Sequence, residues 1–185
     1  MIRDALLCFS GSPTSTTPEP TTIIPASATT TLMPNVIDTS PLGLPTGSGG
    51  GSSVLPNAGR DLGIGGELWL DVNLATVAAS SSGTWQAQLV TGATTSPSTV
   101  LLSSPVLSNA YMVAALVTGP TSILWRTQLP AGNTSYAGAG GIAYAQYIGV
   151  QQVVASAGFT TGTVFAELVT NIQAADLFGS GYAIA

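Results

Sequence analysis

Residues 57–74, NAGRDLGIGGELWLDVNL, contain the stretch that decides the fold. From residue 67 onward, apolar and polar side chains alternate without a slip. The apolar side chains of this run share one face: Leu68, Leu70, Val72 and Leu74. The opposite face carries Glu67, Trp69, Asp71 and Asn73. A period of two predicts a β-strand with one face packed on a core and the other facing water or a partner. The glycines at 63, 65 and 66 allow a tight turn into this strand.

Working outward from this strand, turn signals rich in Gly, Pro and Ser recur at roughly the 8–12-residue spacing of all-β domains. The segments between them are predicted as strands: 32–38, an edge strand interrupted by Pro34, 84–91, 99–103, 111–118, 122–129, 142–156 and 163–170. The run 111–118 is continuously apolar, which predicts a strand buried on both faces. No helix is predicted within this region, so the sequence indicates a two-sheet sandwich.

Alternation also predicts which side chains of these strands share one face. The predicted shared faces are Trp85, Ala87 and Leu89; Ile123, Trp125, Thr127 and Leu129; Tyr144, Gln146, Ile148, Val150, Gln152 and Val154; and Val164, Ala166 and Leu168.

The chain divides by composition into three parts. Residues 1–31 form an N-terminal segment and an arm rich in Pro, Ser and Thr, in which Ile23 and Ile24 provide apolar anchors. Residues 32–170 form the sandwich, with a Gly/Ser loop at 39–56 that is too flexible to build a core. Residues 171–185 form a C-terminal tail. The expected architecture is therefore an all-β sandwich with an extended arm and a tail.

Charge is scarce in this chain. Only 6% of the residues are charged, lysine and histidine are absent, and residues 72–125 and 127–166 carry no charge at all. An ordinary domain has roughly 25% charged residues, and dispersed charge keeps proteins apart. We therefore expect much of the surface to be covered in an assembly. A net charge of −5 argues against partners that are nucleic acids or anionic membranes.

The termini and the single cysteine give further expectations. The apolar run 5–9 is shorter than the usual signal-peptide core, and no run approaches the roughly 20 residues of a membrane-spanning helix. Cytoplasmic synthesis is expected. Cys8 stands alone, so no disulfide within the chain is predicted.

Catalysis is not expected, and neither is a cofactor. Without histidine or lysine, a serine nucleophile has no base, and one cysteine does not supply a zinc site. The remaining option is a carboxylate pair among Asp61, Glu67 and Asp71. Calcium at Asp38, Asp61 or Asp71 is a further alternative, although the acid spacing of an EF-hand is absent. The Gly/Ser tract at 47–53 lacks the Gly-Lys-Ser/Thr sequence of a phosphate-binding loop.

The residues predicted to lie at interfaces are ionic, aromatic or apolar: Arg60, Asp61, Trp69, Arg126, Ile23 and Ile24. Arginine suits bidentate pairing where charge is scarce, and such a pair would fix register between subunits if it is covered. The three tryptophans, Trp69, Trp85 and Trp125, are either core and interface anchors or a sugar-stacking platform. The first reading is favoured in so apolar a chain.

Several short stretches, taken in order, resemble one protein family. They are MIRDALL at 1–7 followed by FS at 9–10, NVID at 35–38, RDLGIG at 60–65, LWL at 68–70, LPAG at 129–132 and TGTV at 161–164. In this order and spacing they resemble the capsid cement (decoration) proteins of tailed bacteriophages of the Bordetella-phage type. The arm 11–31, the insertion 39–56 and the tail after 170 exceed the compact pattern of that family.

The resemblance implies a jelly-roll sandwich on the outer surface of a phage head. It implies binding across capsomer joints to the major capsid protein and to further copies of the chain, as a dimer or trimer, so that the shell is stabilised. The expected location is the exterior of the virion, after synthesis in the host cytoplasm. Two alternatives stay open: a carbohydrate-binding or adhesin-type sandwich that uses the tryptophans, and a carboxylate-based hydrolase.

Overall fold

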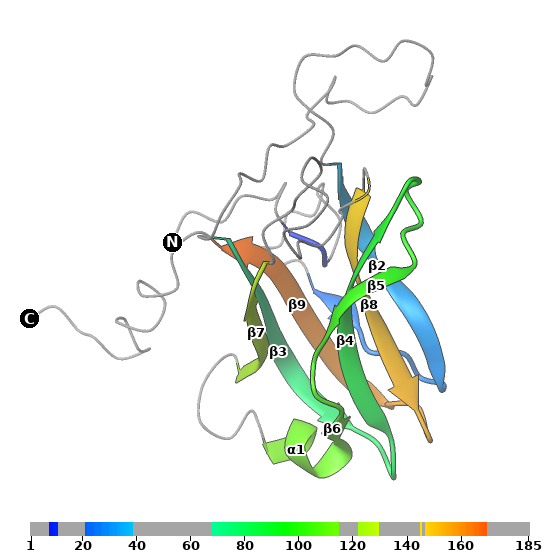
Figure 1. Ribbon diagram of the computed structural model, residues 1–185. Coiled ribbons are helices and arrows are strands. Elements are labelled where there is room, and N and C mark those ends of the chain that lie inside the picture. Colours follow the sequence, from blue (N-terminus) through cyan, green and yellow to red (C-terminus); the bar gives the residue numbers. More distant parts are fainter. Residues whose placement is uncertain are drawn as a thin grey trace, which may run out of the picture.

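The computed structural model describes residues 8–10, 21–38, 68–114, 122–129, 145 and 147–169, and in them two antiparallel sheets pack face to face (Figure 1). The elements are β1 (Thr22–Ile23), β2 (Thr29–Asp38), β3 (Trp69–Ala79), β4 (Thr84–Gly92), β5 (Thr99–Ser103), β6 (Leu107–Ser108), α1 (Asn109–Ala114), β7 (Ser122–Gln128), β8 (Tyr147–Ala155) and β9 (Thr161–Val169). Sheet A has the order β1-β9-β3-β7, and sheet B has the order β2-β8-β4-β5, with β6 also paired to β4.

The strand pairing is nested about the β4–β5 turn. β4 pairs with β5, β3 with β7, β2 with β8 and β1 with β9, as in one long hairpin. Rolling this hairpin brings β3 beside β9 and β4 beside β8, which closes the two sheets. This is the arrangement of a jelly roll, so the all-β sandwich expected from the sequence is confirmed.

The core lies between the sheets and is built from side chains that the alternation placed on shared faces. The strand residues that are fully or almost fully buried there include Leu70, Val72 and Leu74; Trp85, Ala87 and Leu89; Ile148, Val150, Gln152 and Val154; and Val164, Ala166 and Leu168. Each set keeps the period of two, because both sheets contribute alternate side chains to one shared interior. Of the long strand predicted at 142–156, the structure describes residues 145 and 147–156, and in these β8 runs from Tyr147 to Ala155.

The expectation of a Pro-interrupted edge strand is also confirmed. β2 is the outer strand of sheet B, and its register against β8 shifts between Leu32 and Val36, around Pro34. Proline has no amide hydrogen to give to a ladder, so it belongs at an edge or a bulge, and here it occupies both.

One polar side chain inside the core joins the sheets. Gln152 of β8 is fully buried; its Oε1 accepts a hydrogen bond from the Trp85 indole nitrogen at 3.0 Å, and its Nε2 donates to the carbonyl of Ile23 at 3.2 Å. A buried amide requires partners, because an unpaired polar group in a dry interior is costly. Gln152 thereby fastens β1, at the edge of sheet A, to sheet B. β1 and the first residues of β2 lie within the range expected to form the arm.

The segment predicted as the strand 111–118 is different: residues 109–114 form the short helix α1, at one end of the sandwich (Figure 1). Ser108 caps it, since its hydroxyl accepts a hydrogen bond from the amide of Tyr111 at 3.3 Å. Met112 is buried and Tyr111 is half exposed. A short apolar run does not by itself separate a strand from a helix, and the Ser-Asn pair before it was the missed signal. No helix in the described part of the chain is long and apolar enough to cross a membrane.

The predicted faces of β7 are correct only in its second half. Val72 pairs with Trp125 and Asn73 with Ile123, so Leu124 is an extra residue in β7. This bulge turns Leu124 into the core and Ile123 outward, whereas the alternation had placed Ile123 on the same face as Trp125.

Candidate interaction surfaces

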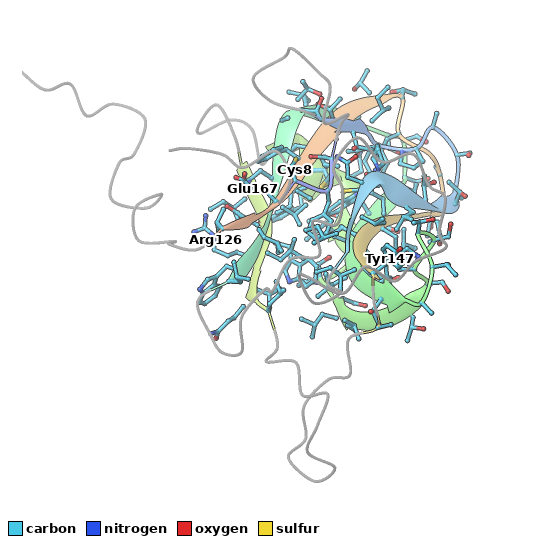
Figure 2. All side chains as sticks on the ribbon, turned by 90° about the horizontal axis from the view of Figure 1, so that it is seen from above. Cys8, Arg126, Tyr147 and Glu167 are labelled. Carbon is cyan, nitrogen blue, oxygen red and sulfur yellow. The ribbon has the colours of Figure 1, made fainter. Side chains whose placement is uncertain are left out.

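A row of ionic and polar side chains crosses the outer face of sheet A. Arg126 of β7 stands opposite Asp71 of β3, Asp71 stands opposite Glu167 of β9, and Glu167 bridges to Cys8. We call these four residues the ionic row. Figure 2 shows Cys8, Glu167 and Arg126 on the same side of the sandwich, away from Tyr147 of sheet B. Neighbouring strands bring these positions together although they are far apart in the sequence.

The ionic row is covered. Asp71 and Glu167 are only 6% and 5% exposed, and Asn73 and Phe165, on the same face, are buried as well. The prediction that this face of β3 meets water or a partner is therefore wrong for Asp71 and Asn73 as the chain folds alone. Both faces of β3 are buried at these positions.

Within the row, the guanidinium of Arg126 donates to Oδ2 of Asp71 at 2.9 Å. The other oxygen of this carboxylate, Oδ1, is buried and has no hydrogen-bond partner in the described part of the chain. A covered pair of this kind specifies register, because shifting either strand would leave a charge buried without its partner. Arg126, expected at an interface, thus pairs with a strand of its own chain.

At the other end of the same face, the side chains are uncharged and, apart from the half-buried Thr163, exposed. Ile23 of β1 pairs with Thr163 of β9, and Thr163 pairs with Thr76 of β3, which precedes Val77. We call these four residues the open row. Ile23 and Val77 are 74% and 52% exposed, and the hydroxyls of Thr76 and Thr163 share a hydrogen bond of 2.9 Å.

The outer face of sheet B is a ladder of amides. The side chain of Gln151 donates to Gln88 at 2.7 Å, and Gln88 in turn donates to Ser103 at 3.2 Å and to Gln86 at 3.4 Å. These side chains are partly exposed and carry no charge. The face is polar without being ionic.

The other predicted interface residues have separate positions. Ile24 is buried in the core of its own chain, so of the two predicted apolar anchors only Ile23 is exposed. Trp69 begins β3 on the outer face with Asp71 and is partly exposed. Arg60 and Asp61 lie outside the described residues.

The tryptophans do not form a shared platform. Trp85 is fully buried, Trp125 packs against the core, and Trp69 lies on the opposite face of sheet A from Trp125. Sugar stacking needs aromatic faces open to solvent on one surface. The reading of Trp85 and Trp125 as core residues agrees with these positions.

The acids considered for catalysis or calcium are likewise not brought together where the structure describes them. Asp71 lies in sheet A and Asp38 at the end of β2 in sheet B, while Asp61 and Glu67 lie outside the described residues. The carboxylate that does stand beside Asp71 is Glu167, which the sequence reasoning missed. Within the described residues, no group of three or more His, Cys, Asp or Glu side chains forms a metal site.

Compared with known proteins, the chain matches no family model and no curated protein sequence.

Proposed function

We propose that this protein is a capsid cement (decoration) protein, which binds the outer surface of a tailed-phage head across capsomer joints and stabilises the shell. Its partners are the major capsid protein and further copies of the same chain. The observation that carries the proposal is the open row, an exposed and uncharged strip of β-sheet in a chain with very few charges. The sequence resemblance and the jelly-roll sandwich support the same function.

The open row suits a protein that works by covering surface. Fully burying an exposed Ile or Val side chain contributes about 1.5–3 kcal/mol, and the half-exposed Val77 contributes correspondingly less. The open row contains no charged group whose hydration would be lost on binding. The threonine hydroxyls beside Ile23 and Val77 already bond to each other, which lowers the cost of drying them. Ile23 is 74% exposed, so most of its apolar surface remains available for a partner to bury.

The ionic row also supports the proposal, because it removes charged side chains from the exposed surface. Three of the few charged side chains, Asp71, Arg126 and Glu167, are covered within the fold, and the Arg126–Asp71 pair among them fixes strand register. The exposed faces are left to amides, hydroxyls and aliphatic groups. Many weak contacts of this kind, repeated on a symmetric lattice, act together as one strong attachment.

The first experiment tests binding to the shell. Purified protein is mixed with mature phage heads that lack it, and bound copies are counted after sedimentation. We expect saturation at a fixed number of copies per capsomer and a higher temperature of DNA release. Failure to saturate, or binding with no gain in heat resistance, would contradict the proposed function.

A matched pair of variants then tests the open row. Val77→Lys places an ion on the row, and we expect at least a tenfold loss of affinity for heads, which is about 1.4 kcal/mol. The control is Val100→Lys on β5 of sheet B, where the valine is similarly exposed; we expect affinity to stay within about twofold, as for an ordinary surface change. Equal losses in both variants would show that the open row is not the contact surface.

A further inference from the structure

The edge strand beside β9 is made of two separate pieces of chain. Cys8 stands opposite Glu167, whereas Thr22 and Ile23 stand opposite Val164 and Thr163. Counting along β9 from the Cys8 bridge, residue 11 would fall opposite Val164, yet Thr22 occupies that place. If residues 11–21 were absent, the two pieces would therefore form one continuous strand beside β9.

The second piece is locked to its own sandwich. Ile24 is buried, its amide donates to the carbonyl of Gly162 at 3.0 Å, and Gln152 holds the carbonyl of Ile23. Gly162 has φ 124°, and a Cβ there would come within 2.9 Å of Ile24 and Ala78, so glycine is required for this close approach. Only residues 24–28 separate β1 from β2, so this piece has no slack.

The first piece, Cys8–Ser10, docks by contacts that do not depend on which copy supplies it. The Phe9 amide donates to the carbonyl of Ala166 at 2.8 Å, and the Ala166 amide donates to the Ser10 hydroxyl at 3.0 Å. On the other side, the Asn35 amide donates to the carbonyl of Phe9 at 3.1 Å. Phe9 is fully buried between the two sheets. All of these groups would be equally satisfied by the same strand from a second molecule.

The length of the insertion allows such an exchange. Eleven residues reach at most about 36–40 Å when extended, which exceeds the radius of gyration of about 16 Å expected for a chain of this size. We propose that Cys8–Ser10 is exchanged between neighbouring copies, so that each strand fills the slot between β9 and β2 of the next molecule. Because the contacts are the same in both forms, local concentration decides between them.

This proposal deepens the proposed function, because it says how one copy of the chain binds the next. It rests on the proposed function in one respect: binding to a shell is what brings the copies to a high local concentration. In isolated protein at low concentration the closed form is favoured, because linking two groups through a short stretch of chain gives an effective concentration on the order of millimolar. Exchange is therefore expected when the copies themselves approach that concentration. It is tested on purified protein without heads, so its failure is distinguishable from failure to bind a shell.

The test uses the one native cysteine. In Glu167→Cys, the new thiol faces Cys8 across a non-hydrogen-bonded strand pair, where the Cα separation of about 4.5 Å suits a disulfide. The protein is incubated at about 1 μM and at about 1 mM, concentrations chosen to lie below and at the tether's effective value. It is then oxidised with oxidised glutathione as electron acceptor and run on a non-reducing gel. We expect an intramolecular bond at the low concentration and crosslinked dimers or larger species at the high one; intramolecular bonds at both would overturn the proposal.

The matched control is the other piece of the same edge strand. Ile23 and Thr163 form a pair with the same bonding pattern, since the next amide, Ile24, donates to Gly162. In Cys8→Ser/Ile23→Cys/Thr163→Cys, we expect an intramolecular disulfide at both concentrations, because β1 is tied closely to β2. Dimers formed equally by this control would overturn an exchange specific to Cys8–Ser10.

A deletion gives a second measurement that leaves Glu167 in place. Joining Ser10 directly to Thr22 makes the two pieces one continuous strand and removes the tether. Light scattering is measured at about 1 mM, where the concentration of other copies equals the effective concentration that the linker gives. We expect the native chain to associate and the deletion variant to stay monomeric. Association of both to the same degree, or of neither, would refute the exchange.

Discussion

The ionic row and the open row lie on the same face of sheet A but differ in charge and in burial. The ionic row joins Arg126, Asp71 and Glu167 and is covered; the open row joins Ile23 to Val77 and is exposed. In most proteins the ions face water and the aliphatic side chains are buried. Here the distribution is reversed on one face.

This reversal has a physical logic. A covered ion pair adds little net stability, but it penalises every alternative register, so it makes the strand pairing specific. An exposed row without ions has no charge repulsion to keep other surfaces away and gains from being covered. One end of the face thus determines how the chain folds, and the other end is available for assembly.

The largest effect should come from breaking the ionic row. Arg126→Met leaves the Asp71 carboxylate buried without its guanidinium, and we expect a loss of about 3–5 kcal/mol in the free energy of unfolding. Chemical denaturation measures it. In Asp71→Leu/Arg126→Met both charges are gone, and most of the loss should be recovered. A loss below about 1 kcal/mol in the single variant, typical of surface pairs, would show that the row is not covered.

An intermediate effect is expected where the open row is fastened to sheet B. Gln152→Leu removes the partner of the Trp85 indole and of the Ile23 carbonyl, and the unpaired buried groups should cost about 1–3 kcal/mol. Denaturation followed by tryptophan fluorescence measures it. The matched control is Gln151→Leu, the next residue along, whose amide faces outward and bonds to Gln88. Equal losses of stability in the two variants would show that the hydrogen bonds of Gln152 do not stabilise the attachment of β1 to sheet B.

The smallest effect belongs to the open row itself. Thr76→Val removes one exposed hydrogen bond to Thr163 while keeping the branched shape that suits a strand, so stability should change by no more than about 0.5 kcal/mol. Thermal unfolding of Thr76→Val and Thr163→Val checks this. A loss above about 1 kcal/mol would mean that the row is buried in solution, and the contrast with the ionic row would disappear.

Much of the sandwich followed from local pattern alone. β5 has the predicted bounds, and the inward faces of β3, β4, β8 and β9 match the alternation. Pro34 correctly predicted an edge strand. Proline has no amide hydrogen for a β-ladder, and this property of the residue does not depend on the rest of the fold. Such features depend on one or a few consecutive residues, which the sequence contains in full.

The two failures have different causes. α1 replaced a predicted strand because its capping contact and tertiary packing outweighed an apolar run of ambiguous length. Ile123 changed face because the bulge at Leu124 is set by pairing with β3. At Ile123 a partner strand remote in sequence decided the outcome, whereas the cap of α1 is a local signal that the sequence analysis missed.

By itself, the sequence determined that this chain is a two-sheet sandwich with few ions, because side-chain alternation and composition are local properties. Only the tertiary structure decided which ions meet: Arg126 and Asp71 are 55 positions apart and are joined solely by the pairing of β7 with β3. The same holds for the split edge strand, in which Ser10 and Thr22 follow one another along β9. The physical reason is that β-pairing creates neighbours across loops of any length, and the residues of one strand do not specify which strand will lie beside it.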